Sequence, residues 1–252
     1  MLFERKLTDS REKAQRLIMA GLVLVDGKKE TKPGTKFDEN VKTEILELPK
    51  YVSRGAEKLE KAYQEFKIDF KNKVVTDIGS STGGFTDFVL QHGAKKVYAI
   101  DVGRGQLDWK LRNDPRVVVM EGVNFRYLES LPEGVDIFLI DVSFISVRKV
   151  LKKIKDIRYL ILDIKEKINK KYSISSIQYP EIILLFKPQF EAGKNIVDKT
   201  KGVIKDPKIH EKLLSEFRKW CGENGFGILG EVESPILGAK GNKEWLFFLR
   251  IR

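Results

Sequence analysis

The chain has 252 residues, of which 42% are hydrophobic and 10% aromatic, so it is long enough for two domains with buried cores. Its 47 basic and 36 acidic residues give a net charge of +11, which favours a polyanionic partner such as nucleic acid. A single cysteine, Cys221, excludes an internal disulfide framework. The chain has only two histidines, His92 and His210, so no metal site is expected. We find no apolar signal region and no long apolar run, which predicts a cytoplasmic protein that does not cross a membrane.

The first part of the chain has the pattern of a small α+β unit. A helix is predicted to start at Asp9 or Ser10, either of which can cap it, and to stop at Gly21. The apolar run that follows ends in Asp26-Gly27, a dipeptide typical of a tight β-hairpin. Residues 41–45 then alternate between apolar and polar side chains, as a strand does.

The stretch SREKAQRLIMAGLVLVDGKKETKPGTKF resembles an RNA-binding module that a small-subunit ribosomal protein shares with some pseudouridine synthases and heat-shock RNA binders. The serine-arginine start, the helix core and the hairpin glycine all match, although the first helix of that family is shortened here. The resemblance implies that arginines around the capped helix lie on RNA phosphates. The expected RNA-binding residues are Arg5, Lys6, Arg11, Arg16, Lys28 and Arg54. The alternative is a solvated basic face, because acidic neighbours nearly balance the charge.

A proline at position 49 ends this unit, and the pattern then changes to alternating strands and helices. We therefore expect an RNA-binding domain of the ribosomal-protein type over residues 1–47, a linker over 48–53 and a catalytic domain over 54–252.

A glycine-rich turn follows the first strand of the second domain. Residues 73–78 form a β-rich run that continues as DIGSSTGGF, then a helical pattern, then a second strand over 96–100 that ends at Asp101. This is a βαβ unit of the nucleotide-binding kind. Dinucleotide enzymes place three glycines at fixed spacing, whereas this turn has the aspartate-first pattern of methyltransferases. Their cofactor has no phosphate and carries an amino group that needs an acceptor.

The cofactor expected at this turn is S-adenosyl-L-methionine. Asp101, about twenty residues after the turn, suits the ribose hydroxyls. The loop after the third strand (117–120) normally lies beside the adenine, although an ordinary loop asparagine is the alternative there. The expected cofactor-binding residues are Asp77, Gly79, Ser80, Ser81, Gly83, Gly84, Phe85, Asp101, Asn124 and Phe125.

Charged residues also stand at the ends of later strands. The strand over 135–140 ends at Asp141, and the strand over 181–186 is followed directly by Lys187. Side chains at the carboxyl ends of central strands point into the crevice where α/β proteins bind ligands. These positions are therefore candidates for the chemistry.

Six motifs are similar to the TlyA family, whose members also carry the name hemolysin A: VSRGAEKL, DIGSSTGGFTD, LIDVSFIS, LLFKPQFEAGK, KGVIKDPKIH and SPILGAKGNKEWLF. That family consists of ribosomal RNA cytidine 2'-O-methyltransferases within the FtsJ-like group, and the similarity covers nearly the whole chain. It implies a lysine-aspartate-lysine-glutamate set, which falls on Lys58, Asp141, Lys187 and Glu244. It also implies ribosomal RNA or ribosomal subunits as partners.

A ribose hydroxyl is a weak nucleophile, so the enzyme has to align it with the methyl group and help it lose its proton. Our hypothesis is that Lys187 is the central lysine, that Asp141 and Glu244 orient it, and that Lys58 positions the ribose or its phosphate. Whether the lysine takes the proton or only stabilises charge stays open at this point.

The fold class expected is a small α+β RNA-binding domain followed by a Rossmann-like, seven-stranded, mostly parallel sheet with helices on both faces and a final antiparallel pair. A helix over 207–221 should cover the sheet, and residues 159–179 look longer than in the family. Two alternatives remain, a hemolysin-like membrane-active protein and an RNA-binding ribosome-assembly factor without catalysis. A pseudouridine synthase is excluded, because such enzymes do not need the cofactor turn.

Overall fold

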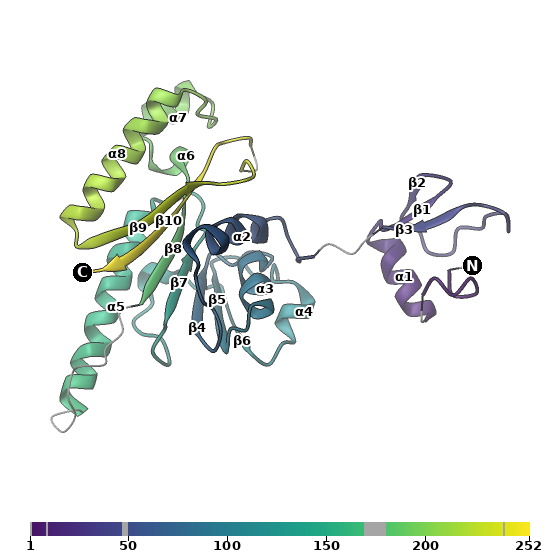
Figure 1. Cartoon of the computed structure of the whole chain (residues 1–252), viewed down its shortest axis with the longest axis horizontal. Coiled ribbons are helices and arrows are strands. Elements are labelled where there is room, and N and C mark those ends of the chain that lie inside the picture. Colours follow the sequence, from purple (N-terminus) through teal and green to yellow (C-terminus); the bar gives the residue numbers. More distant parts are fainter. Residues whose placement is uncertain (1, 9, 47–49, 169–179, 239) are drawn as a thin grey trace. The chain divides into compact units, whose positions relative to one another are not determined.

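The computed structural model describes residues 2–8, 10–46, 50–168, 180–238 and 240–252, without the side chains of residues 12, 13, 16 and 158–168. The chain divides into two compact units, Met1–Lys50 and Tyr51–Arg252 (Figure 1). Each unit has a hydrophobic core of its own.

The described part of the N-terminal unit contains α1 (Arg11–Met19), β1 (Val23–Val25), β2 (Lys28–Glu30) and β3 (Thr43–Ile45). β1 is the middle strand and pairs antiparallel with both others. Asp26 and Gly27 both have positive φ, 49° and 75°, which is the geometry of the tight hairpin that the dipeptide predicts. The cap expected at Asp9 lies outside the described residues.

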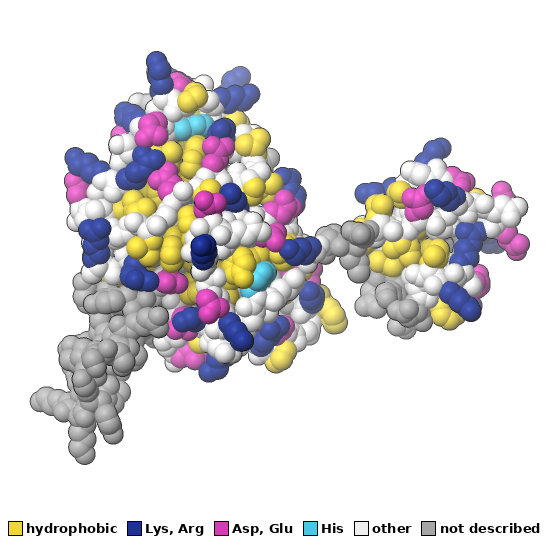
Figure 2. All heavy atoms as spheres, in the orientation of Figure 1, with side chains coloured by type: hydrophobic (Ala, Val, Ile, Leu, Met, Phe, Trp, Pro, Cys, Tyr) yellow, Lys and Arg dark blue, Asp and Glu magenta, His cyan; other side chains and the backbone are white. Residues whose placement is uncertain are grey.

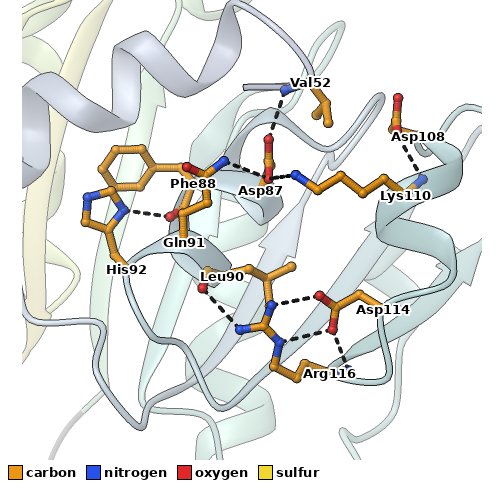
Figure 3. A network of polar contacts seen from close by, with 10 residues as sticks. All are labelled: Val52, Asp87, Phe88, Leu90, Gln91, His92, Asp108, Lys110, Asp114 and Arg116. Atoms are coloured by element: carbon orange, nitrogen blue, oxygen red, sulfur yellow. Dashed lines mark hydrogen bonds and ion pairs between the residues drawn. The ribbon is translucent and has the colours of Figure 1, made fainter. Parts of the chain in front are cut away.

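The first residues of the C-terminal unit pack against its helix α3 (Gly84–Gln91). The Tyr51 ring is buried and lies 5.5 Å from the Phe88 ring, and the Val52 N–H donates to Asp87 Oδ2 at 2.9 Å (Figure 3). Asp87 Oδ1 also accepts from Gln91 and lies 3.3 Å from Lys110 Nζ. Tyr51 and Val52, which the sequence reading assigns to the linker over 48–53, therefore contact the catalytic unit.

Among the described residues, the sheet of this unit has seven strands in the order β6-β5-β4-β7-β8-β10-β9. β4 to β8 are parallel, and β10 is antiparallel to both of its neighbours. This is the mostly parallel sheet with a final antiparallel pair that the sequence predicts. The strands are β4 (Val74–Ile78), β5 (Lys96–Asp101), β6 (Val117–Glu121), β7 (Ile137–Ile140), β8 (Glu181–Phe186), β9 (Phe226–Glu233) and β10 (Trp245–Ile251).

Helices cover both faces of the sheet, because successive strand residues point to opposite sides. One core joins alternate strand residues to α5 (Val147–Ile168) and α8 (Pro207–Glu223), and the other joins the remaining ones to α2 (Gly55–Phe66), α3 (Gly84–Gln91) and α4 (Trp109–Arg112). The other short helices are η1 (Phe125–Tyr127), α6 (Pro188–Glu191) and α7 (Lys194–Lys199).

The C-terminal unit contains two of the helical regions that the sequence predicts. α8 is capped by Asp206, whose carboxylate accepts from the Lys208 N–H at 2.8 Å, and it buries Leu213, Leu214 and Phe217, so the helix expected over 207–221 is confirmed. The long stretch expected over 159–179 continues α5 up to Ile168, and residues 169–179 lie outside the described part of the chain.

The strand order also locates the crevice. β4 comes first in the chain but lies in the interior of the sheet. The next two strands, β5 and β6, lie on one side of it and β7 lies on the other, so the strand order reverses between β4 and β7. Open α/β sheets bind ligands at the carboxyl ends of the strands beside such a point. Ile78, Asp101, Glu121, Ile140 and Phe186 end the five parallel strands at this edge.

Candidate active site

The turn between β4 and α3 brings three parts of the chain close together. Gly79 has a φ of +86° and Gly83 a φ of +94°, a region in which side chains are strained. A Cβ on Gly79 would lie 2.5 Å from the carbonyl oxygen of Asp141, and one on Gly84 would lie 2.4 Å from Ser53 Oγ. Glycine therefore lets the turn contact both the segment after β7 and the segment before α2.

Asp77, near the end of β4, is 1% exposed. Its Oδ2 accepts from the Thr86 N–H at 3.0 Å and from the Thr86 hydroxyl at 2.7 Å. Its Oδ1 is buried and has no hydrogen-bond partner among the described residues. Burial raises the pKa of Asp77 to about 7 against the opposing effect of the Thr86 hydrogen bonds, and the nearby Asp141 and Asp101 carboxylates add to the rise. The unpaired oxygen is an acceptor suited to a cationic group.

Asp101 ends β5 and joins the turn to the next loop. Its Oδ2 accepts from the Ser81 N–H at 2.9 Å and its Oδ1 from the Gly103 N–H at 2.7 Å. Carboxylate oxygens can accept more than one hydrogen bond each, so both keep capacity for a ligand.

A cavity of about 580 Å³ lies at the carboxyl ends of β4, β5 and β7, within the range of roughly 300–1,000 Å³ usual for small-molecule sites. The expected residues that line it are Gly79, Ser81, Asp101, Asn124, Phe125 and Asp141. A second cavity of about 120 Å³ shares part of this lining and adds Asp77, Ser80, Gly84 and Phe85. Gly83 lines neither cavity and is the N-cap residue of α3.

The two residues expected beside the adenine have different surroundings. Asn124 Oδ1 accepts from the backbone N–H of Arg126 at 3.2 Å and so caps η1. The Phe125 side chain is buried and its ring packs edge-to-face against Phe138, so this ring belongs to the core. Sequence reasoning missed further lining residues, among them Val102 and Gln106 after β5 and Val123 and Arg126 after β6.

The four residues expected to carry the chemistry form two ion pairs. Lys187 Nζ lies 2.6 Å from Asp141 Oδ1 and donates to Ser143 Oγ at 3.0 Å. Lys58 Nζ, from α2, lies 2.6 Å from Glu244 Oε2. The side chains of Lys58 and Lys187 are about nine-tenths buried, so water weakens these pairs far less than it weakens surface pairs.

The pairing differs from the hypothesis in one respect. Glu244 was expected to orient Lys187, but the structure pairs it with Lys58, and Asp141 is the carboxylate of Lys187. The Glu244 side chain is 3% exposed, and a Cβ on Gly238 would lie 2.3 Å from its Oε1. The glycine in the loop before β10 therefore makes room for this carboxylate.

Sequence reasoning missed three residues next to these pairs. Ser143 contacts Lys187, and Glu191 accepts hydrogen bonds from the Ser146 hydroxyl and the Val147 N–H, both at 2.7 Å. Phe144 is 91% exposed, has a φ of +64°, and lies 5.1 Å from the Phe190 ring. Their only signal in the sequence is that they lie in the same short segments as Asp141 and Lys187.

Basic side chains of the N-terminal unit are interspersed with acidic and apolar ones on the face that Figure 2 shows. The expected RNA-binding residues Lys6, Arg11, Lys28 and Arg54 are exposed. Arg5 is half-buried and donates to the carbonyl oxygens of Val41 and Glu39 and to Thr43 Oγ1, so it holds the chain's own loop rather than facing solvent. The side chain of Arg16 lies outside the described residues.

The described residues contain neither a candidate membrane span nor a candidate metal site. In the part of the chain that the structure describes, no helix is long and apolar enough to cross a bilayer. The same residues contain no group of three or more side chains that could hold a metal ion.

Comparisons with known proteins agree with this geometry. Residues 51–251 match the family of FtsJ-like methyltransferases, and residues 1–41 match the S4 domain. The 16S/23S rRNA (cytidine-2'-O)-methyltransferase TlyA of Mycobacterium tuberculosis is 38% identical over 99% of this chain and 87% of its own length. Hemolysin A of Brachyspira hyodysenteriae is 43% identical over 95% of this chain and 93% of its own.

A solved structure from Streptococcus thermophilus, whose name assigns it provisionally to the hemolysins, is 40% identical with a TM-score of 0.71. It covers 99% of this chain and 86% of its own. The family resemblance inferred from the six motifs is therefore confirmed. The chain belongs to the FtsJ-like methyltransferases, as a member of the TlyA family with an S4 domain ahead of the catalytic domain.

Proposed function

We propose that the chain transfers a methyl group from S-adenosylmethionine to a ribose 2'-hydroxyl of ribosomal RNA, with cytidine as the target. The observation that carries this proposal is the Lys187–Asp141 ion pair, because Asp141 also lines the large cavity. The relative from Mycobacterium tuberculosis, whose name gives this reaction, matches almost the whole chain.

The residues around the two cavities fit this cofactor. The unpaired Oδ1 of Asp77 is an acceptor for the α-amino group, and Asp101 at the end of the next strand is an acceptor for the ribose hydroxyls. The large cavity extends from Asp101 past Asn124 to Asp141, which leaves room for an adenosine beside the catalytic carboxylate.

S-adenosylmethionine supplies a methyl group on a positively charged sulfur, which makes the methyl carbon strongly electrophilic. The protein has to place the hydroxyl in line with that carbon and to remove or neutralise its proton. Lys187 is the candidate for this task, because its Nζ contacts Asp141 and Ser143, which both line the cavity. Its amine serves either as the base or as the cation that stabilises the alkoxide.

The second ion pair supports the substrate rather than the reacting atoms. Lys58 lies near the start of α2, and Glu244, directly before β10, holds its Nζ. A lysine held in this way can bind a ribose oxygen or a phosphate. Lys6, Arg11 and Lys28 of the S4 domain and Arg54 are the remaining candidates for phosphate contacts.

The test is methyl transfer to ribosomal RNA or ribosomal subunits that lack 2'-O-methylation, measured with radiolabelled cofactor and followed by mapping of the modified nucleotide. Lys187→Ala should lower the rate at saturating cofactor by at least about 100-fold, the range of general acid–base catalysis. The affinity for S-adenosylmethionine, measured by calorimetry, should stay within about threefold, because Lys187 does not line the large cavity.

Lys96→Ala is the matched control. Lys96 also forms a 2.6 Å ion pair, with Glu133, but it lies at the start of β5, at the opposite end of the sheet. It should leave the rate unchanged. A Lys187→Ala protein as active as the wild type would show that this assignment is wrong. A wild-type protein that binds ribosomal RNA and transfers no methyl group would favour the assembly factor without catalysis.

A further inference from the structure

Two segments that carry proposed catalytic residues leave the sheet side by side. β7 ends at Ile140 and β8 at Phe186, and these strands are parallel neighbours. Beyond the ends of these strands, the backbone hydrogen bonds of the β-ladder no longer hold the two segments together. Residues 141–146 lead into α5, and residues 187–191 include the short helix α6. The position of Asp141 relative to Lys187 therefore depends on contacts between the two segments.

Side chains make those contacts at three successive places. Lys187 binds Asp141 and Ser143, at 2.6 and 3.0 Å. The Phe144 ring lies 5.1 Å from the Phe190 ring. At the far end of both segments, Glu191 binds the residues that begin α5. The first contact belongs to the catalytic set and Phe144 of the second lines the cavity, so the last one anchors the segments away from the site.

Glu191 makes this anchor with both carboxylate oxygens. Its Oε1 accepts from the Val147 N–H and its Oε2 from the Ser146 hydroxyl, each at 2.7 Å, across 44 and 45 positions of the chain. The side chain is 2% exposed, and Arg148 Nε lies 3.7 Å away. A helix start has free N–H groups and a partial positive charge, which together favour a carboxylate. The two hydrogen bonds therefore fix both the position and the orientation of the Glu191 carboxylate at the start of α5.

The contact does more than cap the helix. Ser146 Oγ also accepts from the Arg148 N–H at 3.3 Å, so the start of α5 has a local cap of its own. Burial raises the pKa of Glu191 against the opposing effect of its hydrogen bonds, which shows that the buried charge has a desolvation cost. A buried charged group is weak evidence for stability, so a role in fixing geometry explains this contact better than a role in stability.

We propose that Glu191 is a positioning residue for methyl transfer: its carboxylate ties the start of α5 to the end of α6 and so holds Lys187 and Asp141 in register. This inference rests on the proposed function. Only three residues separate Glu191 from Lys187, and the Phe190 N–H donates to the Lys187 carbonyl oxygen at 2.9 Å, so a shift at Glu191 reaches the lysine. A displacement of about 1 Å can cost about 100-fold in rate.

The variant to make is Glu191→Leu, which removes both acceptors and keeps an apolar side chain of similar size. The rate of transfer at saturating cofactor and RNA should fall by about 30- to 100-fold, with the KM for RNA and the affinity for S-adenosylmethionine within about threefold of wild type. Glu191→Gln, which can still accept from the Val147 N–H, should recover most of the rate. Ser146→Ala, a milder change on the opposite segment, should lower it by about three- to tenfold.

A second measurement needs no RNA. The rate at which an amine-acylating reagent modifies Lys187, followed by mass spectrometry, should rise several-fold in Glu191→Leu, because the amine is less firmly held. Asp136→Asn is the matched control, since Asp136 also accepts a backbone N–H, from Val74 at 2.8 Å, but lies just before the start of β7. It should change neither measurement.

The outcomes separate the two proposals. A wild-type protein that transfers no methyl group contradicts the proposed function, and the labelling experiment still tests Glu191. Unchanged transfer and unchanged Lys187 labelling in both Glu191→Leu and Ser146→Ala would overturn the positioning role. So would a loss that appears only as weaker cofactor binding, with the rate at saturation intact.

Discussion

The Asp77 carboxyl is buried beside the proposed cofactor site and keeps one oxygen without a hydrogen-bond partner among the described residues. Burial raises its pKa from 3.8 to about 7. Between these values the folded protein holds a proton that the unfolded chain has lost, so this group lowers the free energy of unfolding as the pH rises from 3.8 to about 7. A cationic ligand group would pair with the ionised carboxylate and so lower the pKa of Asp77 again.

Asp77→Asn should therefore stabilise the ligand-free protein at pH 8 and weaken cofactor binding. We expect the Tm of the catalytic unit to rise by about 2 °C or more at pH 8 and by less at pH 6, where the wild-type carboxyl is largely protonated. The affinity for S-adenosylmethionine should fall by at least about tenfold, because the acceptor for the amino group is lost. Calorimetric melting and titration measure the two effects.

Asp114→Asn is a suitable control, because Asp114 pairs with Arg116 at the surface and should affect neither quantity appreciably. Cofactor binding within threefold of wild type in Asp77→Asn would show that Asp77 is not the acceptor.

At the scale of elements, α3 connects the cofactor turn to the segment that precedes α2. Gly84 begins the helix against Ser53, and one turn later Asp87 accepts the Val52 N–H at 2.9 Å (Figure 3). The Asp87 side chain is 2% exposed, whereas Lys110, its ion-pair partner from α4, is 66% exposed. The backbone bond and the surface ion pair thus share one carboxylate but differ in their exposure to water.

Asp87→Ala should lower the free energy of unfolding by about 1–3 kcal/mol, because it leaves the Val52 N–H without its acceptor in a partly buried place. Lys110→Ala should cost less than about 1 kcal/mol, since water screens an exposed ion pair. Urea unfolding of the two variants measures the difference. Equal effects would mean that the ion pair, rather than the backbone bond, holds the segment.

At the scale of the whole molecule, the net charge of +11 is shared between two units with separate cores. In the S4 domain the side chains of Lys6, Arg11 and Lys28 are exposed, whereas Arg5 forms hydrogen bonds within the domain. Contacts to phosphates are ionic and release counterions, so they weaken as salt is added.

RNA affinity should therefore fall steeply with salt concentration, and Lys6→Glu/Arg11→Glu/Lys28→Glu should make the slope of log K against log salt shallower by about 2. Filter binding at several salt concentrations measures this slope. The control replaces three exposed lysines by glutamate near the starts of β4 and β5, at the end of the catalytic sheet opposite the cavity: Lys67, Lys71 and Lys95. If both triple variants changed the slope equally, net charge rather than the S4 surface would govern binding.

The sequence by itself determined the elements and the family. The parallel strands are short runs rich in β-branched residues, and the turn after Asp77 contains the glycines that its positive φ angles require, so both can be recognised from neighbouring residues. The ends of the parallel strands then indicated Asp77, Asp101, Asp141 and Lys187, because parallel strands end at one edge of a sheet.

Only the tertiary structure decided which side chains meet. Lys58 and Glu244 are 186 positions apart, and Glu191 lies 44 positions from Val147, so their contacts follow from the order of β7, β8 and β10 in the sheet. The same holds for Arg5, whose guanidinium is bonded to a loop more than thirty positions away. The physical reason is that local patterns depend on backbone preference and burial, whereas the partner of a charged group depends on the path of the whole chain.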